Sequence, residues 1–535
     1  MSITLPLDST ACAQADDVFY CLHADDPTLF DASGQRIPLS ADDPDQQHLR
    51  EQWCDLYEDI VAHRTDGSRP FPACAVPGHR HHEADCPHCL HPGPGDDVST
   101  DPVEGDPVDP VQGCPCQEEG RPTVRLRVSM FFDGTGNNRD NVTTGGHAYE
   151  SYEAGYSNIA RLESAGVRKA PALTKHITVY TEGIGTTSGG ADDTQGAALG
   201  TGPTGVLAKV DAGRDAALAE IRAAADEAGS EVIEYLHVDA FGFSRGATAA
   251  RHFVHSACVE PSTLLQTALV MAGYEVGEVV VKFVGLFDTV ASYGAYHLND
   301  TAELHLDAIK VAERVVQIAA AEEHRATFRL TNIRSAGSRG TEIFLPGVHS
   351  DIGGGYADGA DEVDVQLFDI DFYSWSPLEA ALKIPTYYRE KQWMIDTGWY
   401  REDQLSEDWQ WQLWGNRRNL SNKYSYIPLQ MMASHARQWG VDFTSAVEGR
   451  HPVPVELAGI HSTLLAAAGS GQCSSASAWF GKDPALDPPW HKWLRNTYLH
   501  FSALYGLAAK QGTQRPNFYP PHPVYGKRVR GVNDG

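Results

Sequence analysis

The chain after residue 122 alternates between short apolar runs and longer helical patterns. Residues 124–132 alternate apolar and polar side chains and contain many branched and aromatic types, and residues 177–181 form a second, shorter run of this kind. Residues 279–287 are apolar almost throughout, which is typical of a strand covered on both faces. Residues 206–228 are alanine-rich and predict a long helix. Strands that alternate with helices predict an α/β fold, with a mainly parallel sheet and helices on both of its faces.

One later segment has a helical pattern with two interpretations. Residues 301–325 place apolar side chains at helical spacing, namely Leu304, Leu306, Ile309, Val311, Val315, Val316 and Ile318. We expect an amphipathic helix over this segment. Such a helix is either an ordinary crossover between strands or a lid over a site.

Composition divides the chain into four regions. Residues 1–91 are acidic and rich in cysteine and histidine, and residues 92–122 are rich in proline, glycine and aspartate, which is typical of a linker. Residues 123–360 carry the alternating strands and helices and are the expected catalytic domain. Residues 361–535 form an accessory region with ten of the eleven tryptophans. These tryptophans fit a packed domain, and Trp409-Gln-Trp-Gln-Leu-Trp414 also fits a membrane contact or an acyl-chain groove.

The charge distribution limits the partners of the chain. Its 535 residues include 71 acidic and 42 basic side chains, a net charge of −29, and residues 1–120 alone hold 24 acidic and 5 basic ones, a net charge of −19. Nucleic-acid binding needs an excess of positive charge, so we expect no nucleic-acid partner. The last stretch is basic, which fits a solvated tail or contact with anionic lipid; its cations are Lys510, Arg515, Lys527, Arg528 and Arg530.

No segment predicts insertion into a membrane. Residues 1–17 have neither the basic n-region nor the apolar h-region of a signal peptide, so we expect synthesis in the cytoplasm without general secretory export. No run of about 18 apolar residues occurs, so any action on lipid would start from the membrane surface.

Eight of the ten cysteines fall within the first 116 residues. Residues 74–91 combine cysteines with histidines, and Cys86-Pro-His-Cys89 has the spacing of a zinc-binding pair. The candidate ligands are Cys74, Cys86, Cys89 and His91. The second pair is not at a standard spacing, so disulfides formed in an oxidising compartment, or reduced thiols on a surface loop, fit the same residues.

The most informative chemical motif is Gly242-Phe-Ser-Arg-Gly246. It follows an extended run that begins at Tyr235 and precedes a helix of small residues. A serine on so tight a strand-to-helix turn is pushed out of the sheet, and the positions two before and two after it need to be nearly free of side chains. We therefore expect Ser244 to be a catalytic nucleophile, with a structural glycine-rich turn as the alternative.

Such a serine needs a histidine as base and a carboxylate that orients the histidine, in the chain order serine, acid, histidine. Asp288 follows the apolar run 279–287, and His349 follows residues 342–348, so both lie where parallel strands place their active sites. A helix cap at Asp288 and an ordinary loop histidine are the alternatives. Asp351 is the alternative acid, although it adjoins a glycine-rich loop whose amides it could bind instead.

Ester hydrolysis also needs backbone N–H groups that stabilise an oxyanion. One comes from the residue after the nucleophile, Arg245, and another from a loop after an early strand. The turn Asp133-Gly-Thr-Gly136 follows the first strand, so Gly134 or Thr135 is the expected second donor, with a plain tight turn as the alternative. This chemistry requires no metal or organic cofactor.

Five motifs resemble, in order, those of the α/β-hydrolase family that includes type VI secretion phospholipase effectors. They are Phe131-Phe-Asp-Gly-Thr-Gly-Asn-Asn138, Ser157-Asn-Ile-Ala-Arg161, Gly242-Phe-Ser-Arg-Gly-Ala247, Gly285-Leu-Phe-Asp-Thr-Val290 and Pro346-Gly-Val-His-Ser-Asp-Ile-Gly-Gly-Gly-Tyr356. The resemblance covers about residues 122–360 and leaves the first 120 residues and much of the last third outside it. It implies a triad of Ser244, Asp288 and His349 and phospholipase A activity on glycerophospholipids.

The resemblance also implies a biological setting. Effectors of this family are injected into rival bacteria, travel on the secretion spike, act at the phospholipid membrane of the target cell, and are neutralised in the producer by an immunity protein. The residues alone leave two alternatives open, a carboxylesterase or neutral lipase, and a non-enzymatic cargo of the spike that keeps the hydrolase fold. A serine phospholipase of the A1 or A2 type is the function that the sequence favours.

Overall fold

The computed structural model contains two compact units, residues 1–122 and 123–535. It describes five short strands between residues 2 and 37, and then residues 121–294, 300–325, 327–369, 377–409, 411–479, 487–503 and 530–535. The five strands form an antiparallel sheet in chain order: β1 (Ser2–Thr4), β2 (Ala11–Ala15), β3 (Val18–Leu22), β4 (Thr28–Asp31) and β5 (Arg36–Ile37). The candidate zinc ligands Cys74, Cys86, Cys89 and His91 lie outside the described residues.

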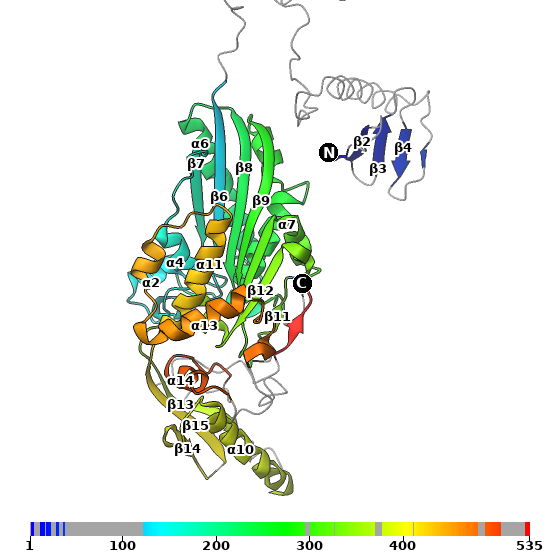
Figure 1. The fold of residues 1–535 in the computed structure, drawn as a ribbon. Coiled ribbons are helices and arrows are strands. Elements are labelled where there is room, and N and C mark those ends of the chain that lie inside the picture. The colour runs from blue at the N-terminus through cyan, green and yellow to red at the C-terminus, as the bar shows by residue number, and fades with distance from the viewer. Residues whose placement is uncertain are drawn as a thin grey trace, which may run out of the picture. The chain divides into compact units, whose positions relative to one another are not determined.

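The second unit is built on a parallel sheet of six strands (Figure 1). Their order across the sheet is β12-β10-β9-β8-β6-β7, and all five pairings are parallel. The strands are β6 (Thr123–Phe132), β7 (Lys175–Thr181), β8 (Val232–Phe243), β9 (Glu275–Phe287), β10 (Arg314–Ala320) and β12 (Gly340–Leu345). The predicted α/β fold with a mainly parallel sheet is confirmed.

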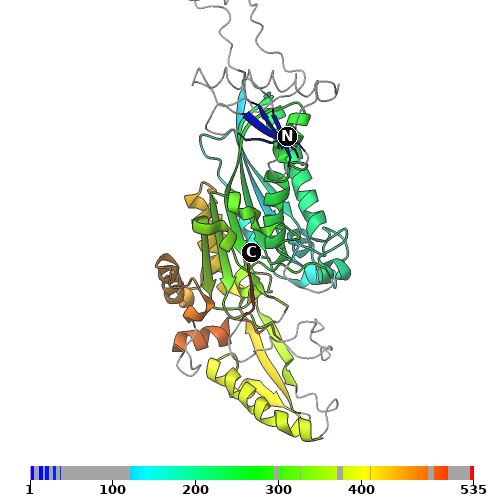
Figure 2. The ribbon, with the colours of Figure 1, turned by 90° about the vertical axis from the view of Figure 1, so that its right-hand side faces the viewer.

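Helices cover both faces of this sheet, and Figure 2 shows the sheet between the two helical layers. One layer contains α6 (Val206–Glu227) and α7 (Arg245–Cys258), and the other contains α4 (Asn158–Ala165) and α11 (Tyr426–Gln438). Along β6, Met130 and Phe132 belong to the core under the first layer, whereas Phe131 belongs to the core under the second. The alternation of side chains along a strand therefore builds two cores. Further helices are α2 (Arg139–Thr144), α3 (Glu150–Glu153), α5 (Thr194–Leu199), α8 (Leu265–Met271), α9 (His349–Gly353), α12 (Ala446–Arg450) and α13 (Ala458–Gly469).

The prediction of an amphipathic helix over residues 301–325 is wrong. Leu306–Val311 is a short 3₁₀ helix, and β10 follows it as an inner strand between β9 and β12. Val315, Val316 and Ile318 are buried in the sheet. A short apolar run has the same appearance in a buried strand as in a buried helix, so its parallel neighbours, rather than its local spacing, decide its conformation.

Part of the tryptophan-rich region forms a small antiparallel sheet in the order β13-β15-β14, packed against a long helix. These elements are β13 (Ala360–Asp369), β14 (Leu405–Glu407), β15 (Gln412–Leu420) and α10 (Pro377–Thr397). Figure 1 shows them beyond the carboxyl ends of the central strands. Trp393, Trp399 and Trp414 are buried, whereas Trp409 is 72% exposed. Packing therefore accounts for the first three, and Trp409 is a surface residue.

Buried charges fix another helix, α14 (Pro489–Thr497), against the central sheet. Glu322 follows β10 and accepts a hydrogen bond of 2.6 Å from Arg495 Nε, and Arg495 Nη1 donates to Asp487 at 2.8 Å. All three side chains are buried. A buried charge without a partner is strongly unfavourable, so these contacts hold α14 beside the carboxyl end of β10. None of the helices in the described ranges is long and apolar enough to cross a bilayer.

Candidate active site

Ser244 lies at the junction of β8 and α7. Its backbone angles are φ 58° and ψ −128°, a conformation that residues other than glycine rarely adopt and that the surrounding structure has to impose. The flanking glycines are required by crowding. A Cβ at Gly242 would lie 2.3 Å from the carbonyl oxygen of Gly246, and one at Gly246 would lie 2.2 Å from that of Asp133. The turn thus has the tight geometry that its sequence predicts.

This crowding predicts a loss of stability when Gly246 becomes alanine. The methyl group would overlap two backbone carbonyl oxygens, those of Asp133 and Phe132, so β6 and α7 would have to separate. We expect the free energy of unfolding to fall by about 1–3 kcal/mol or more, as for other overpacked sites. Urea unfolding followed by circular dichroism measures the change.

Gly459→Ala is the matched control for this variant. Gly459 lies in α13, and a Cβ there would meet no atom within 4 Å. Alanine is the better helix former by up to about 1 kcal/mol, so this variant should be as stable as the parent or more so. Equal stability of the two variants would contradict the role assigned to crowding at the turn.

His349, the first residue of α9, contacts Asp288 directly. Its Nδ1 lies 2.5 Å from Asp288 Oδ2, and both side chains are buried. An ionised carboxylate only accepts hydrogen bonds, so Nδ1 donates and Nε2 is left to accept a proton. Burial lowers the pKa of His349 below its ordinary value, although Asp288 acts in the opposite direction. The imidazole is therefore neutral, and able to act as a base, at neutral pH.

Phe243 brings the serine turn and the histidine together. Its ring packs on the His349 imidazole, with the ring centroids 4.6 Å apart, and a Cβ at Gly134 would lie 2.5 Å from the same ring. Within the described part of the chain no hydrogen bond joins Ser244 Oγ to His349. Catalytic hydrogen bonds are often long in the absence of substrate, so this geometry is compatible with a base that acts on Ser244 once substrate is bound.

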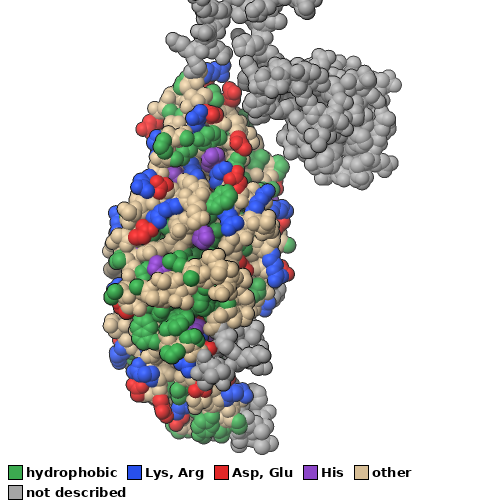
Figure 3. Space-filling view, in the orientation of Figure 1, with side chains coloured by type: hydrophobic (Ala, Val, Ile, Leu, Met, Phe, Trp, Pro, Cys, Tyr) green, Lys and Arg blue, Asp and Glu red, His purple; other side chains and the backbone are tan. Residues whose placement is uncertain are grey.

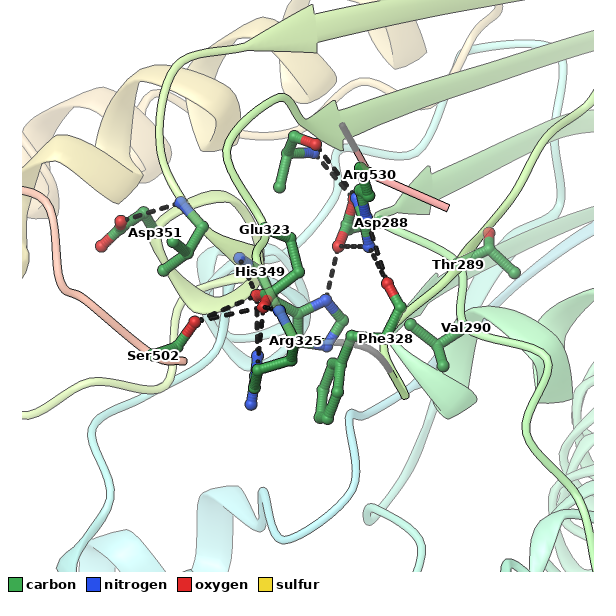
Figure 4. Close-up of polar contacts among 12 residues, drawn as sticks. Asp288, Thr289, Val290, Glu323, Arg325, Phe328, His349, Asp351, Ser502 and Arg530 are labelled. Carbon is green, nitrogen blue, oxygen red and sulfur yellow. Dashed lines mark hydrogen bonds and ion pairs between the residues drawn. The ribbon is translucent and has the colours of Figure 1, made fainter. Parts of the chain in front are cut away.

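Asp288 has a second partner, the charged side chain of Arg530, which the sequence did not indicate. The Arg530 guanidinium donates to Oδ1 at 2.5 Å and to Oδ2 at 2.8 Å, and the Ala320 N–H donates to Oδ1 at 2.7 Å (Figure 4). Burial alone would raise the pKa of Asp288, but the charge of Arg530 and the hydrogen bond from His349 outweigh it and hold that pKa below its ordinary value. Asp288 therefore stays ionised although it is fully buried.

Asp351, the alternative acid, binds different groups. It accepts hydrogen bonds from His500 Nδ1 at 2.9 Å and from the Val348 N–H at 3.0 Å, and burial raises its pKa. Figure 4 shows its carboxylate away from the His349 ring. The structure thus brings Asp288, and not Asp351, to His349.

Glu323 is a further carboxylate near His349 that sequence reasoning missed. It accepts the backbone N–H of His349 at 3.2 Å, is paired with Arg325 at 2.9 Å, and accepts the hydroxyl of Ser502 at 3.2 Å. The charge of Arg325 helps to hold the pKa of Glu323 far below its ordinary value despite burial. The pair Glu322-Glu323 directly after an apolar run was the available signal, but it pointed to a strand end only if residues 314–320 were recognised as a strand.

The turn after β6 distinguishes the two expected oxyanion donors. The Gly134 N–H already donates to Asp133 Oδ1 at 2.8 Å, whereas the Thr135 N–H has no acceptor among the described residues. Arg245 Nε donates to Thr135 Oγ1 at 2.9 Å, which ties this turn to the first residue of α7. Thr135 is therefore the better of the two expected donors in this turn.

No group of three or more histidine, cysteine, aspartate or glutamate side chains within the described ranges is arranged to hold a metal ion. The two cysteines described there, Cys258 and Cys473, are free thiols. The cysteine- and histidine-rich segment falls outside those ranges, so zinc binding by it stays a prediction.

Comparison with known proteins connects this geometry to a family. Residues 269–375, which include Asp288 and His349, match the family model of the catalytic domain of Tle1-like phospholipase effectors of type VI secretion. The matched segment does not include Ser244. The resemblance to type VI secretion phospholipase effectors that its motifs indicate is confirmed at the level of the family. No curated protein matches the sequence.

Solved structures give the same picture for the fold. The structure of the Tle1 effector bound to the VgrG spike of the type VI secretion system matches with a TM-score of 0.51 and 22% identity, over 78% of this chain and 94% of that one. An uncharacterized protein from Pseudomonas aeruginosa matches with a TM-score of 0.35 and 18% identity, over 66% and 52% of the two chains, which is too low to support a conclusion. This chain therefore shares its fold with the Tle1 effector.

Proposed function

We propose that this protein is a serine phospholipase of the A type that hydrolyses acyl esters of membrane glycerophospholipids. The observation that carries the proposal is the 2.5 Å contact between His349 Nδ1 and Asp288, formed at the carboxyl end of β9 next to the strained turn of Ser244. A buried histidine whose tautomer is fixed by an ionised carboxylate is the base that a serine nucleophile requires. The match of residues 269–375 to a phospholipase family supports the same assignment.

The proposed reaction has two steps. Ser244 Oγ attacks the acyl carbonyl carbon while His349 Nε2 takes the hydroxyl proton, and Asp288 stabilises the imidazolium that forms. The backbone N–H groups of Arg245 and Thr135 stabilise the oxyanion. Collapse of the tetrahedral intermediate breaks the ester bond, and His349 returns the proton to the leaving lysophospholipid oxygen. Water, activated by His349, then cleaves the acyl-serine and releases the fatty acid.

Exposed apolar side chains on α13 and α14 support action at a lipid surface. Val455, just before α13, is 87% exposed, Leu465 of α13 is 44% exposed, and Trp493 of α14 is 40% exposed. Figure 3 shows hydrophobic side chains gathered on this part of the molecule. Trp490 and Trp493 face α13 across an open groove. Tryptophan suits a bilayer interface because it has an apolar ring and a polar N–H, so we assign membrane contact to this face.

The proposed setting is antibacterial. The Tle1 structure that matches this fold is a complex with the VgrG spike. We propose delivery on a secretion spike, action on phospholipid membranes of target cells, and protection of the producer by an immunity protein. The proposed chemistry needs no metal or organic cofactor.

Fatty-acid release from phospholipid vesicles tests the function. Vesicles whose sn-1 and sn-2 acyl chains differ in length are incubated with the full chain, and the released acids are separated by mass spectrometry; neutral-lipid emulsions and short-chain esters are assayed in parallel. We expect release from vesicles and covalent labelling of Ser244 by a fluorophosphonate. Activity on neutral or short esters alone would make the protein a lipase or carboxylesterase. Absence of both labelling and hydrolysis would refute a serine hydrolase.

A further inference from the structure

Arg530 is buried beside Asp288, although the two residues are far apart in the sequence. It is buried, it lies 242 residues after Asp288, and it follows a segment outside the described residues. All five of its N–H groups have acceptors. Four go in pairs to Asp288 and the Phe328 carbonyl, at 2.5, 2.8, 2.9 and 3.1 Å, and the fifth goes to the Ala320 carbonyl at 3.0 Å.

Residues 530–535, here called the clasp, hold the guanidinium in place. Within the clasp, β16 (Val532–Asn533) pairs in parallel with β11 (Leu330–Thr331). Arg329 Nε donates to Asn533 Oδ1 at 2.8 Å, and Asn332 Nδ2 donates to Asp534 Oδ1 at 2.8 Å. The clasp therefore adds a strand beside the site and delivers one cation to the acid of the dyad.

The Arg530 contacts bear on both partners of the dyad. The bidentate pair fixes the plane of the Asp288 carboxylate, so that Oδ2 faces His349. The Phe328 carbonyl that Arg530 holds belongs to a residue whose ring packs edge-on against His349, with centroids 5.0 Å apart. Arg530 thus orients the Asp288 carboxylate, and it also holds the backbone of Phe328, whose ring packs against His349.

We propose that Arg530 is a positioning residue of the active site, which orients Asp288 and weakens the binding of a proton to the Asp288–His349 pair, so that the site is complete only when the clasp is docked. This inference rests on the proposed function. It assigns to the clasp a role in the chemistry that the basic composition of the last stretch of the sequence did not suggest.

The sign of the electrostatic effect follows from charge. Among the described residues, the charged groups around the Asp288–His349 pair are Glu323 and Arg325, which act on His349, and Arg530, which binds Asp288. Removal of the Arg530 cation leaves more net negative charge around the pair, so the pair binds its proton more tightly. Glu323 and Arg325 remain in every variant and contribute equally to all. The active, deprotonated base should therefore appear at higher pH without Arg530.

The test compares the pH dependence of Ser244 labelling by a fluorophosphonate, and of kcat/KM on a soluble ester, in four full-length proteins. For Arg530→Ala we expect kcat/KM to fall on the order of 100-fold, as for other misplaced catalytic groups. The acid limb of the profile should move up by roughly one pH unit or more. Arg530→Lys keeps the positive charge but cannot form the bidentate pair with Asp288. The acid limb of its pH profile should therefore stay near that of the parent while kcat falls. Arg418→Ala removes an exposed guanidinium that pairs with Asp361, outside the clasp, and should change neither kcat/KM nor the acid limb.

Chemical rescue separates positioning from a structural role. Low millimolar methylguanidinium should restore part of the rate of Arg530→Ala and return its acid limb toward that of the parent, with no effect on Arg418→Ala. If Arg530→Ala does not fold, Arg530→Gln replaces it in the same measurements of pH dependence and rate. Glutamine keeps an amide donor but has no charge. Two results would overturn the inference. One is a folded variant without the Arg530 charge whose acid limb lies at the parental pH; the other is a loss of kcat/KM that Arg418→Ala shares and that methylguanidinium does not rescue. Failure of the parent protein itself to label at Ser244 would instead refute the proposed function.

Discussion

Ser244→Ala should lower kcat on phospholipid vesicles on the order of 10⁶-fold, because removal of a serine nucleophile leaves only binding and oxyanion stabilisation. Nothing else in the turn can replace it: Gly242 and Gly246 have no side chains, and the Arg245 side chain is bound to Thr135. The measurement is the initial rate of fatty-acid release at saturating vesicle concentration, together with the loss of fluorophosphonate labelling.

Ser262→Ala is the control for this variant. Ser262 is exposed and its hydroxyl bonds only to the nearby carboxylate of Glu260 among the described residues, at 3.0 Å. It should keep the parental rate and labelling. The rate expected after loss of the nucleophile is far below about one part in a thousand of the parental rate. If Ser244→Ala retained more than about that fraction, Ser244 would not be the nucleophile.

Asp288→Asn should lower kcat about 10⁴-fold, because the amide can no longer hold His349 in the tautomer with Nδ1–H, and Nε2 then carries the proton. The same change leaves the Arg530 cation buried without its carboxylate. Breaking a buried ion pair lowers the free energy of unfolding by about 3–5 kcal/mol, so a fall in stability should accompany the loss of activity. Both are measured, kcat on vesicles and urea unfolding, so that activity is compared only among folded proteins.

Asp351→Asn provides the matched comparison between the two candidate acids. The asparagine keeps an oxygen acceptor for Val348 or His500 but weakens the set of hydrogen bonds. We expect stability to fall by about 1–3 kcal/mol and kcat to stay within roughly one order of magnitude. The opposite ranking, with the larger loss of kcat at Asp351, would make Asp351 the catalytic acid.

The candidate site was accessible from the sequence because its parts follow local rules. A serine between two glycines at a strand-to-helix junction needs only neighbouring residues to be recognised, and Asp288 lies directly after an apolar run. Parallel strands bring their carboxyl ends to one edge of a sheet, so residues after different strands could be expected to meet. The contact between His349 and Asp288 is a consequence of this rule.

The failure at residues 314–320 shows where local patterns stop being sufficient. Val315, Val316 and Ile318 fit a helix as well as a strand, and only pairing with β9 and β12 decides between them. The same error hid Glu323. A carboxylate that follows a helix is not expected at the active site, whereas one that follows a parallel strand lies at the edge of the sheet where active sites form.

By itself, the sequence predicted the α/β fold, the tight turn at Ser244, and Asp288 and His349 as candidate acid and base, because a pattern of nearby residues indicates each of them. Only the tertiary structure decided that Asp351 binds His500, that Thr135 rather than Gly134 has the unpaired N–H among the described residues, and that Arg530 reaches Asp288. The physical reason is the range of the interactions. Hydrogen bonds and ion pairs act over a few ångströms between side chains that folding brings together from positions up to 242 residues apart, and no local pattern records such a pairing.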